Sequence, residues 1–226
     1  MCKIICKYSK IGNLKYISHL DVLRFIQRAV KRAGINAKYS EGFNPHMKTS
    51  FGFPLSLGTE SIGEYFDIEL NDDITPEDFE KKINAVMPKE MQILKADYSS
   101  DTQSLMARCV YSEYIITIES DNMNIDKLNE LLTEMLETGV VYIRQKKNKK
   151  NKLVNKEINT KELIKYLNTE KVNENKAKIE AVFITTETGS MKVDEFLKLV
   201  SERAFNIDYN TIMKIDALDK DMRPIL

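Results

Sequence analysis

The order of apolar patterns in the first 98 residues limits the fold more than any other feature of this sequence. Residues 2–9 and 61–70 alternate between apolar and polar side chains, which is typical of strands. Between them, apolar residues recur at helical spacing from Ser18, a candidate N-cap, until Gly34. Further patterns predict a strand at 35–40, a helix at 75–87 and a strand at 91–98. This order of strand, helix, strand, strand, helix and strand indicates a ferredoxin-like α+β sandwich.

The second half of the chain shows a similar order of patterns. Strands are predicted at 107–120, 140–147, 178–187 and 211–218, and helices at 124–136, 160–167 and 193–204. We therefore predict an α+β chain of two ferredoxin-like βαββαβ sandwiches in tandem. The first domain is expected at residues 1–99 and the second at residues 105–226.

Composition places the chain among folded globular proteins, since 42% of its 226 residues are hydrophobic and 30% are charged. No apolar run reaches the roughly 18 residues that would span a bilayer, and the first residues lack the apolar segment of a signal peptide. A cytoplasmic location without membrane contact is therefore expected. The three cysteines, Cys2, Cys6 and Cys109, form no C-x-x-C pair, so we expect reduced thiols, no bound metal and no cofactor.

Charge is distributed unevenly along a chain whose net charge is zero. Residues 1–51 hold ten Lys or Arg and two acidic residues, a net charge of +8, whereas residues 52–100 hold four Lys and eleven acidic residues, a net charge of −7. Four of the basic residues lie in the helix predicted after Ser18: Arg24, Arg28, Lys31 and Arg32. Because residues four apart share one face of a helix, we expect a basic ridge that binds phosphates.

Residues 39–58 differ in composition from the rest of the chain. Gly42, Gly52 and Gly58 permit close turns, while Pro45 and Pro54 fix the backbone. Aromatic and polar side chains are interleaved here, a combination suited to contacting the bases and phosphates of single-stranded or looped RNA. The candidates for RNA recognition in this segment are Tyr39, Phe43, Asn44, His46 and Lys48. The alternative is structural, with the three Phe rings of the segment holding the loop on the core.

A second basic cluster runs from Arg144 to Lys156 and contains seven positive charges and no acid. Its residues Arg144, Lys146 and Lys147 are further candidates for contact with RNA. The alternative is a solvated hairpin between two strands.

Two histidines, His19 and His46, are the candidates for catalysis by imidazole. As a pair they would donate and accept protons in metal-independent RNA cleavage. The sequence contains none of the motifs G-x-x-x-x-G-K-[ST], G-x-G-x-x-G, G-x-S-x-G and H-E-x-x-H, so nucleotide, hydrolase and zinc chemistry lack support.

Three stretches within residues 15–70 resemble a bacterial family of radical-SAM-associated domains of unknown function: KYISHLDVLRFIQRAVKRAG, YSEGFNPHMKTSFGFPLSLGTES and GEYFDIEL. The resemblance implies a partner, a radical-SAM-like protein encoded beside this chain or fused to it, and a role near RNA maturation. The chain lacks the cluster-binding C-x-x-x-C-x-x-C motif of such an enzyme, because Cys2 and Cys6 are followed by Ser9 where a third Cys is required.

Three functions agree with these features. The first is a non-catalytic accessory module that binds tRNA or rRNA and acts with a radical-SAM-like partner. The second is a metal-independent RNA-processing enzyme that uses His46 and His19. The third is a protein-interaction domain whose loop docks on the radical-SAM-like partner, oriented by the acidic stretch from Glu60 to Glu80.

Overall fold

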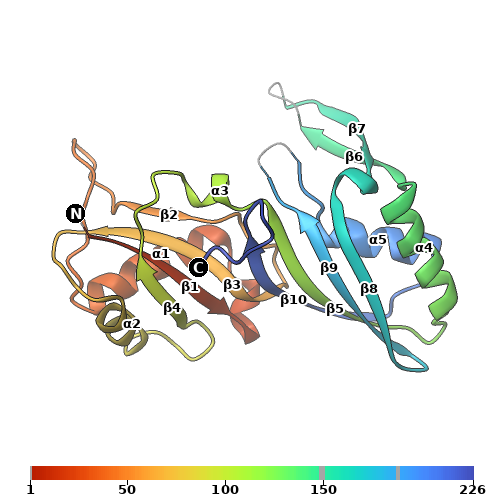
Figure 1. Cartoon of the computed structure of the whole chain (residues 1–226), viewed down its shortest axis with the longest axis horizontal. Coiled ribbons are helices and arrows are strands. Elements are labelled where there is room, and N and C mark those ends of the chain that lie inside the picture. The colour runs from red at the N-terminus through yellow and green to blue at the C-terminus, as the bar shows by residue number, and fades with distance from the viewer. Residues whose placement is uncertain (1, 148–150, 187–188) are drawn as a thin grey trace. The chain divides into compact units, whose positions relative to one another are not determined.

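The computed structural model describes residues 2–147, 151–186 and 189–226. In these ranges the chain is an α+β protein with a mixed eight-stranded sheet and a separate two-stranded ribbon (Figure 1). It forms two compact units: unit 1 comprises Met1–Ser112 and Ile212–Leu226, and unit 2 comprises Glu113–Thr211. The domain boundary expected near residues 99–105 stays a prediction.

Unit 1 is built around a sheet with helices packed on it. Its elements are β1 (Cys2–Lys10), the 3₁₀ helix η1 (Gly12–Tyr16), α1 (His19–Arg32), β2 (Thr49–Phe51), β3 (Glu60–Leu70), α2 (Pro76–Asn84), β4 (Ile93–Tyr98), the short α3 (Leu105–Arg108) and most of the last strand, β10 (Tyr209–Leu218). β1 pairs antiparallel with both β3 and β4. β2 pairs antiparallel with the C-terminal half of β3, and β10 pairs parallel with its beginning. Residues 212–226 therefore group with unit 1 although they follow unit 2 in sequence.

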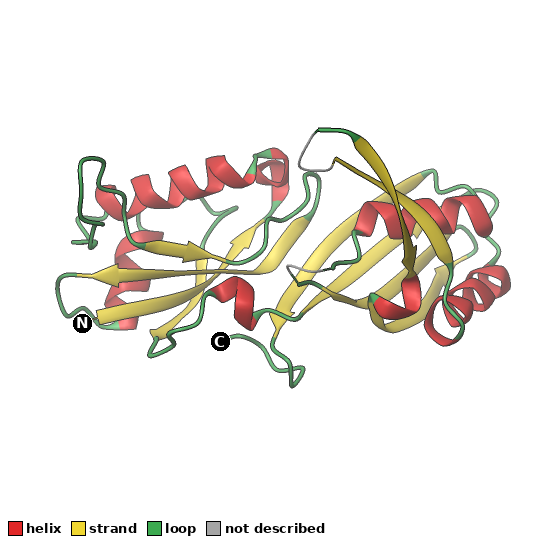
Figure 2. Ribbon diagram, turned by 90° about the horizontal axis from the view of Figure 1, so that it is seen from above, coloured by secondary structure: helices red, strands yellow, loops and turns green. Residues whose placement is uncertain are grey.

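The main core of unit 1 lies between the sheet and the helices α1 and α2 (Figure 2). The Ser18 hydroxyl accepts a hydrogen bond from the Asp21 amide at 3.2 Å and so caps α1, while Gly34, with φ +67°, follows its last turn. The buried side chains of the two helices are Val22, Ile26, Ala29 and Val30 of α1 and Phe79 and Ile83 of α2. Local patterning therefore predicted both helices and the face each one buries.

Charged side chains are buried where β10 meets the sheet of unit 1. Asp216 accepts hydrogen bonds from Lys7 Nζ and from the Tyr65 hydroxyl, each at 2.5 Å. Burial and the hydrogen bond to Asp216 raise the pKa of Tyr65 well above its ordinary value, so the phenol stays protonated. A second pair joins Lys214 Nζ to Glu64 Oε1 at 2.8 Å. These contacts fix the C-terminal strand to β1 and β3.

Unit 2 combines three strands of the large sheet with two helices and the ribbon. Its elements are β5 (Tyr111–Glu119), α4 (Ile125–Glu137), β6 (Val141–Lys147), β7 (Leu153–Asn159), the 3₁₀ helix η2 (Thr160–Glu162), β8 (Ile164–Asn173), β9 (Lys176–Ile184) and α5 (Val193–Arg203). β9 pairs antiparallel with β8, and β5 lies on its other side. β6 and β7 pair only with each other in the described part of the chain, which makes the ribbon.

Two elements predicted from the sequence are wrong. Residues 35–40 make only isolated bridges, and the strand of this region is the short β2. Residues 160–167 do not form a helix, because η2 ends at Glu162 and β8 begins at Ile164. Pairing of β8 with β9 overrides the local helical spacing of apolar residues there. Strand β7 was not predicted, since its first five residues are exposed and lack an alternating pattern.

Candidate nucleic-acid interface

Helix α1 turns its predicted phosphate ligands away from the core. Arg24, Arg28, Lys31 and Arg32 are all exposed. Arg24 approaches Asp21 at 3.4 Å, and the Arg32 guanidinium donates to the Val86 carbonyl at 3.2 Å. Within the described ranges Arg28 has no hydrogen bond or ion pair, so its charge is available to a ligand.

The loop after α1 is closed at its base and exposed at its tip. The Ser40 amide donates to the His46 carbonyl at 2.8 Å, and the Ser40 hydroxyl accepts from the His46 amide at 3.0 Å. The same hydroxyl lies 2.9 Å from His46 Nδ1, which holds the imidazole ring in place. Gly42 has φ +113°, a backbone angle that favours glycine, and it turns the chain so that Phe43 is fully exposed. The loop therefore presents an aromatic ring to solvent on a defined frame.

A contact between Lys31 and Tyr39 joins the loop to the basic face of α1. Lys31 Nζ lies 5.7 Å from the centroid of the Tyr39 ring, within the range of a cation–π interaction. Lys48, on the strand side of the loop, lies 3.6 Å from Glu69 Oε2, so part of its charge is already balanced. This contact places Lys31 of α1 beside Tyr39 at the start of the loop. We use the name α1–loop face for the predicted helix and loop residues taken together: Arg24, Arg28, Lys31, Tyr39, Phe43, Asn44, His46 and Lys48.

The three phenylalanines of residues 39–58 have different environments. Phe51 is buried and stacks on Phe66 with ring centroids 5.5 Å apart. Phe53 is half-buried against the smaller cluster that contains Ile5 and Tyr65. The structural role considered for these rings therefore applies to Phe51 and Phe53, whereas the exposed Phe43 contributes nothing to the core.

The two histidines have different surroundings. His19 begins α1, and its ring contacts Phe51 edge-on at 6.1 Å between centroids. His46 lies in the loop that Lys31 contacts through Tyr39, and the twelve residues from His19 to Lys31 span about 18 Å of helix. Burial lowers the pKa of His19 below its ordinary value, so this ring is neutral at pH 7. No hydrogen bond or ring contact joins His19 to His46 among the described residues, and their use as a catalytic pair stays a prediction.

The basic segment in unit 2 includes an arginine that is already paired within the protein. Arg144 lies in β6, where its Nε donates to Glu195 Oε1 at 2.8 Å and its Nη2 donates to the Ser190 carbonyl at 2.8 Å. Its side chain is mostly buried. The candidates Lys146 and Lys147 also lie in β6, opposite Val154 and Leu153, but their side chains lie outside the described part of the structure. Arg144 therefore holds the ribbon on α5.

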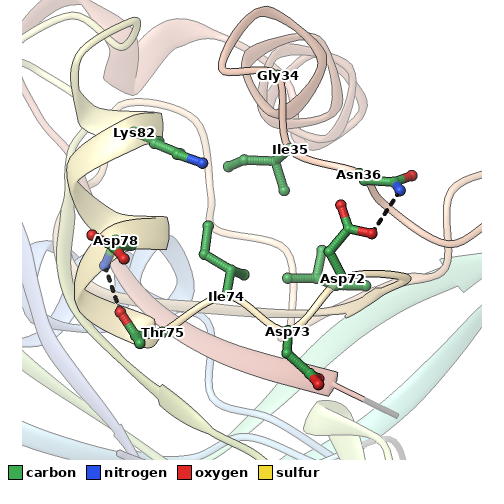
Figure 3. A pocket seen from close by; sticks show the side chains of 10 residues that line it. Gly34, Ile35, Asn36, Asp72, Asp73, Ile74, Thr75, Asp78 and Lys82 are labelled. Carbon is green, nitrogen blue, oxygen red and sulfur yellow. Dashed lines mark hydrogen bonds between the residues drawn. The ribbon is translucent and has the colours of Figure 1, made fainter.

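A pocket of about 250 Å³ beside the end of α1 has the opposite charge (Figure 3). Asp72, Asp73 and Asp78 line it together with Lys82, and Asn36 Nδ2 donates to Asp72 Oδ1 at 3.0 Å. Sequence reasoning missed this pocket, although the run NDDITPED is a visible acidic signal. Three carboxylates against one ammonium repel a polyanion, so the pocket limits the α1–loop face on this side.

Slow reaction of all three thiols with DTNB is expected in the folded protein. Cys2, Cys6 and Cys109 are buried, and burial raises the pKa of Cys6 well above its ordinary value and that of Cys109 to about 11. At pH 8 a thiol with that pKa is a thiolate in only about one molecule in a thousand. Absorbance should show complete reaction only after denaturant is added. Native labelling within seconds would contradict this environment.

No group of metal-ligating side chains occurs among the described residues.

The fold and this surface define an α+β protein whose first unit carries an exposed basic helix beside a projecting aromatic loop. The chain belongs to the DUF2344 family, described as an uncharacterized protein conserved in bacteria, whose model matches residues 3–193. No curated protein matches the sequence. No helix in the described ranges is long and apolar enough to cross a membrane.

Several solved structures are similar in fold. A chain of the archaeal box H/ACA sRNP Nop10-Cbf5 complex aligns with a TM-score of 0.50 and 8% identity, over 96% of this chain and 49% of that chain. A chain of a Cbf5-Nop10-Gar1 complex aligns with a TM-score of 0.49 and 10% identity, over 96% of this chain and 50% of that chain. A chain of an H/ACA RNP bound to a substrate RNA containing 2'-deoxyuridine gives a TM-score of 0.49 and 10% identity, over 97% of this chain and 49% of that chain. The chain spans about half the length of the solved chains it matches.

Proposed function

We propose that this protein is a non-catalytic accessory module that binds structured RNA, tRNA or rRNA, through the α1–loop face. Arg24, Arg28 and Lys31 contact phosphates, with Arg32 at the edge of the same helix. Phe43 stacks on an unpaired base, while Asn44 and His46 offer polar atoms to the nucleotide beside it. The Lys31–Tyr39 contact carries the proposal, because it brings one exposed cation of α1 against an aromatic ring at the start of the loop.

The proposed partner is a radical-SAM-like protein, as the resemblance of residues 15–70 implies. The RNA module would present the polymer, and the partner would supply the reaction. On this proposal residues 1–99 and residues 105–226 are the two ferredoxin-like sandwiches, with β10 counted in the second. The strand orders β4-β1-β3-β2 and β10-β5-β9-β8 support this view, with the β6–β7 ribbon as an insertion in the second. The similar archaeal chain comes from a small ribonucleoprotein, a setting that agrees with RNA binding, but at 8% identity the likeness concerns the fold.

Replacing Arg24 and Arg28 together with Ala is expected to weaken binding of labelled tRNA or rRNA fragments about tenfold at moderate salt. With two phosphate contacts fewer, RNA binding by this variant releases fewer counterions. The slope of log K against log salt should therefore become shallower by about 1.4 to 1.8. A salt series of fluorescence anisotropy titrations measures both quantities. The charge-matched control replaces the exposed Lys127 and Lys161 of unit 2 with Ala. A flat, micromolar or weaker response that the arginine variant leaves unchanged would remove the proposal.

Replacing Phe43 with Ala is expected to cost about 1–3 kcal/mol of RNA binding, the usual contribution of one stacked base. The thermal unfolding midpoint should stay unchanged, because the ring is fully exposed and packs on nothing. Phe43→Tyr keeps an aromatic face and should bind as the wild type does. Equal affinities for the Ala and Tyr variants would show that the ring does not contact RNA.

Docking of the partner protein is a second candidate function, favoured by exposed apolar side chains near the start of α1. Tyr16, Leu20 and Leu57 are each more than half exposed, and the Gly58 amide donates to the Lys15 carbonyl at 3.0 Å, which joins their two segments. Hydrogen exchange of the protein with RNA and with the purified radical-SAM-like protein separates the two functions. RNA should protect residues 39–47, and a docked partner should protect residues 16–20 and 53–58.

A further inference from the structure

Strand β6 has one edge without a hydrogen-bonded neighbour in the described part of the chain. Next to the ribbon, the Thr160 amide donates to the Val140 carbonyl at 3.1 Å, which identifies residues 140 and 160 as a hydrogen-bonded pair. Such pairs alternate with non-hydrogen-bonded pairs in an antiparallel ladder. The main-chain groups of Tyr142 and Arg144 therefore point toward β7. Those of Val141, Ile143 and Gln145 point outward.

A groove of about 600 Å³ lies along this outward edge. It is lined by Tyr142, Ile143, Arg144 and Gln145 of β6 and by Glu195, Lys198, Leu199 and Glu202 of α5. Val141 and Ile143 are each 53% exposed, so the edge offers apolar side chains as well as main-chain donors and acceptors. Natural sheets usually protect such edges with Pro, a bulge or a cover, and residues 141–145 have neither Pro nor bulge.

Two contacts join the strand and the helix that line the groove. The Tyr142 hydroxyl donates to Glu195 Oε2 at 2.7 Å, and Arg144 Nε donates to Glu195 Oε1 at 2.8 Å. Both contacts tie β6 to α5. The open edge and the helix therefore face the same space without needing to rearrange before binding.

Charge in the groove favours a polypeptide over a polyanion. Its two cations and two anions are paired with each other, Arg144 with Glu195 and Lys198 with Glu202 at 3.6 Å. Among the described side chains that line the groove these charges cancel, so phosphate groups gain little there, unlike at the α1–loop face. Unpaired main-chain groups spaced two residues apart instead match the backbone of an extended peptide.

We infer that this groove is a strand-addition site for an extended, uncharged segment of a partner protein. The main chain of the segment pairs with Val141, Ile143 and Gln145, and one of its apolar side chains packs beside Ile143. This site is independent of RNA binding by unit 1.

The experiment begins with a displayed library of random nine-residue peptides selected on the wild-type protein. The best peptide is synthesised and titrated by fluorescence anisotropy. Ile143→Pro removes one outward amide and leaves the β6–β7 ladder intact, so it should weaken binding tenfold or more. Asn155→Pro is the matched control, because its amide points outward from the opposite edge of the same ribbon. It should bind as the wild type does, and Ile143→Thr should retain most of the affinity.

Amide exchange measured by NMR on the wild-type protein provides a readout that does not depend on a variant folding. Addition of the peptide should slow exchange at Val141, Ile143 and Gln145 and leave Asn155 unchanged. The inference is overturned by enrichment of no peptide, by equal binding to Ile143→Pro, or by equal losses in the two Pro variants. Protection of the same three amides by self-association, seen as a dimer in light scattering, would make the occupant a second copy and overturn the partner assignment.

Discussion

Replacing Glu64 with Leu is expected to lower the free energy of unfolding by about 3–5 kcal/mol. Glu64 and Lys214 are each 6% exposed, and their side chains meet at 2.8 Å. Removing the carboxylate takes away the negative charge that Glu64 holds against the buried ammonium, and the Ser61 hydroxyl loses the acceptor that it contacts at 3.0 Å. The measurement is guanidinium unfolding followed by circular dichroism.

The double variant Glu64→Leu with Lys214→Met is the control for this prediction. It removes both charges and leaves apolar side chains of similar length, so most of the lost stability should return. A double variant as unstable as Glu64→Leu alone would mean that the charge pair is not the cause. A single variant within 1 kcal/mol of the wild type would contradict the buried pair itself.

Replacing Gly63 with Ala is expected to destabilise the protein by about 3 kcal/mol, the upper end for overpacking. A Cβ atom at this position would lie 2.4 Å from Asp216 Cα and 2.5 Å from the Ile215 carbonyl oxygen. Both are backbone atoms of β10, so the strand itself would have to move away from β3. That shift would also disturb the contacts of Asp216 with Lys7 and Tyr65. Thermal and guanidinium unfolding measure the loss.

Gly52→Ala is the matched control for Gly63→Ala. The nearest atom to its added Cβ would be the Tyr65 carbonyl oxygen at 3.8 Å, an ordinary contact, and the Gly52 amide keeps its hydrogen bond to that oxygen. Its stability should stay within about 0.5 kcal/mol of the wild type. Equal losses at the two glycines would show that backbone freedom, and not close approach of β10, decides the outcome.

Much of unit 1 was predictable because its signals are local. The cap at Ser18, the helical spacing after it and the stop at Gly34 predicted α1 with its buried and exposed faces. Pro76 and the acids after Thr75 did the same for α2. The predictions for residues 35–40 and 160–167 were wrong because strand pairing with a distant segment decides what a short apolar run becomes. The first range makes only isolated bridges, and the end of the second range pairs with β9.

The candidate site was predictable in its residue types and less so in its grouping. Charge and ring content selected both Lys31 and Tyr39, and the structure brings these two side chains together. The same reasoning paired His19 with His46, but the structure gives these rings different partners, Phe51 for His19 and Ser40 for His46. It selected Arg144 for its charge, but no local pattern could reveal the Glu195 carboxylate 51 residues away that binds it.

By itself the sequence determined the helices α1, α2, α4 and α5, most strands of unit 1, the basic face of α1 and the composition of the loop, because caps, periodicity and charge act over a few residues. Only the tertiary structure decided that β10 returns to β3, since the contact between Lys214 and Glu64 spans 150 residues. It also decided which cations are exposed and which are neutralised, and that β6 has an edge beside α5 with no paired strand among the described residues. Strand order and the pairing of charges depend on desolvation and on contacts between segments far apart in the sequence. These effects arise only when the chain folds and brings the segments together.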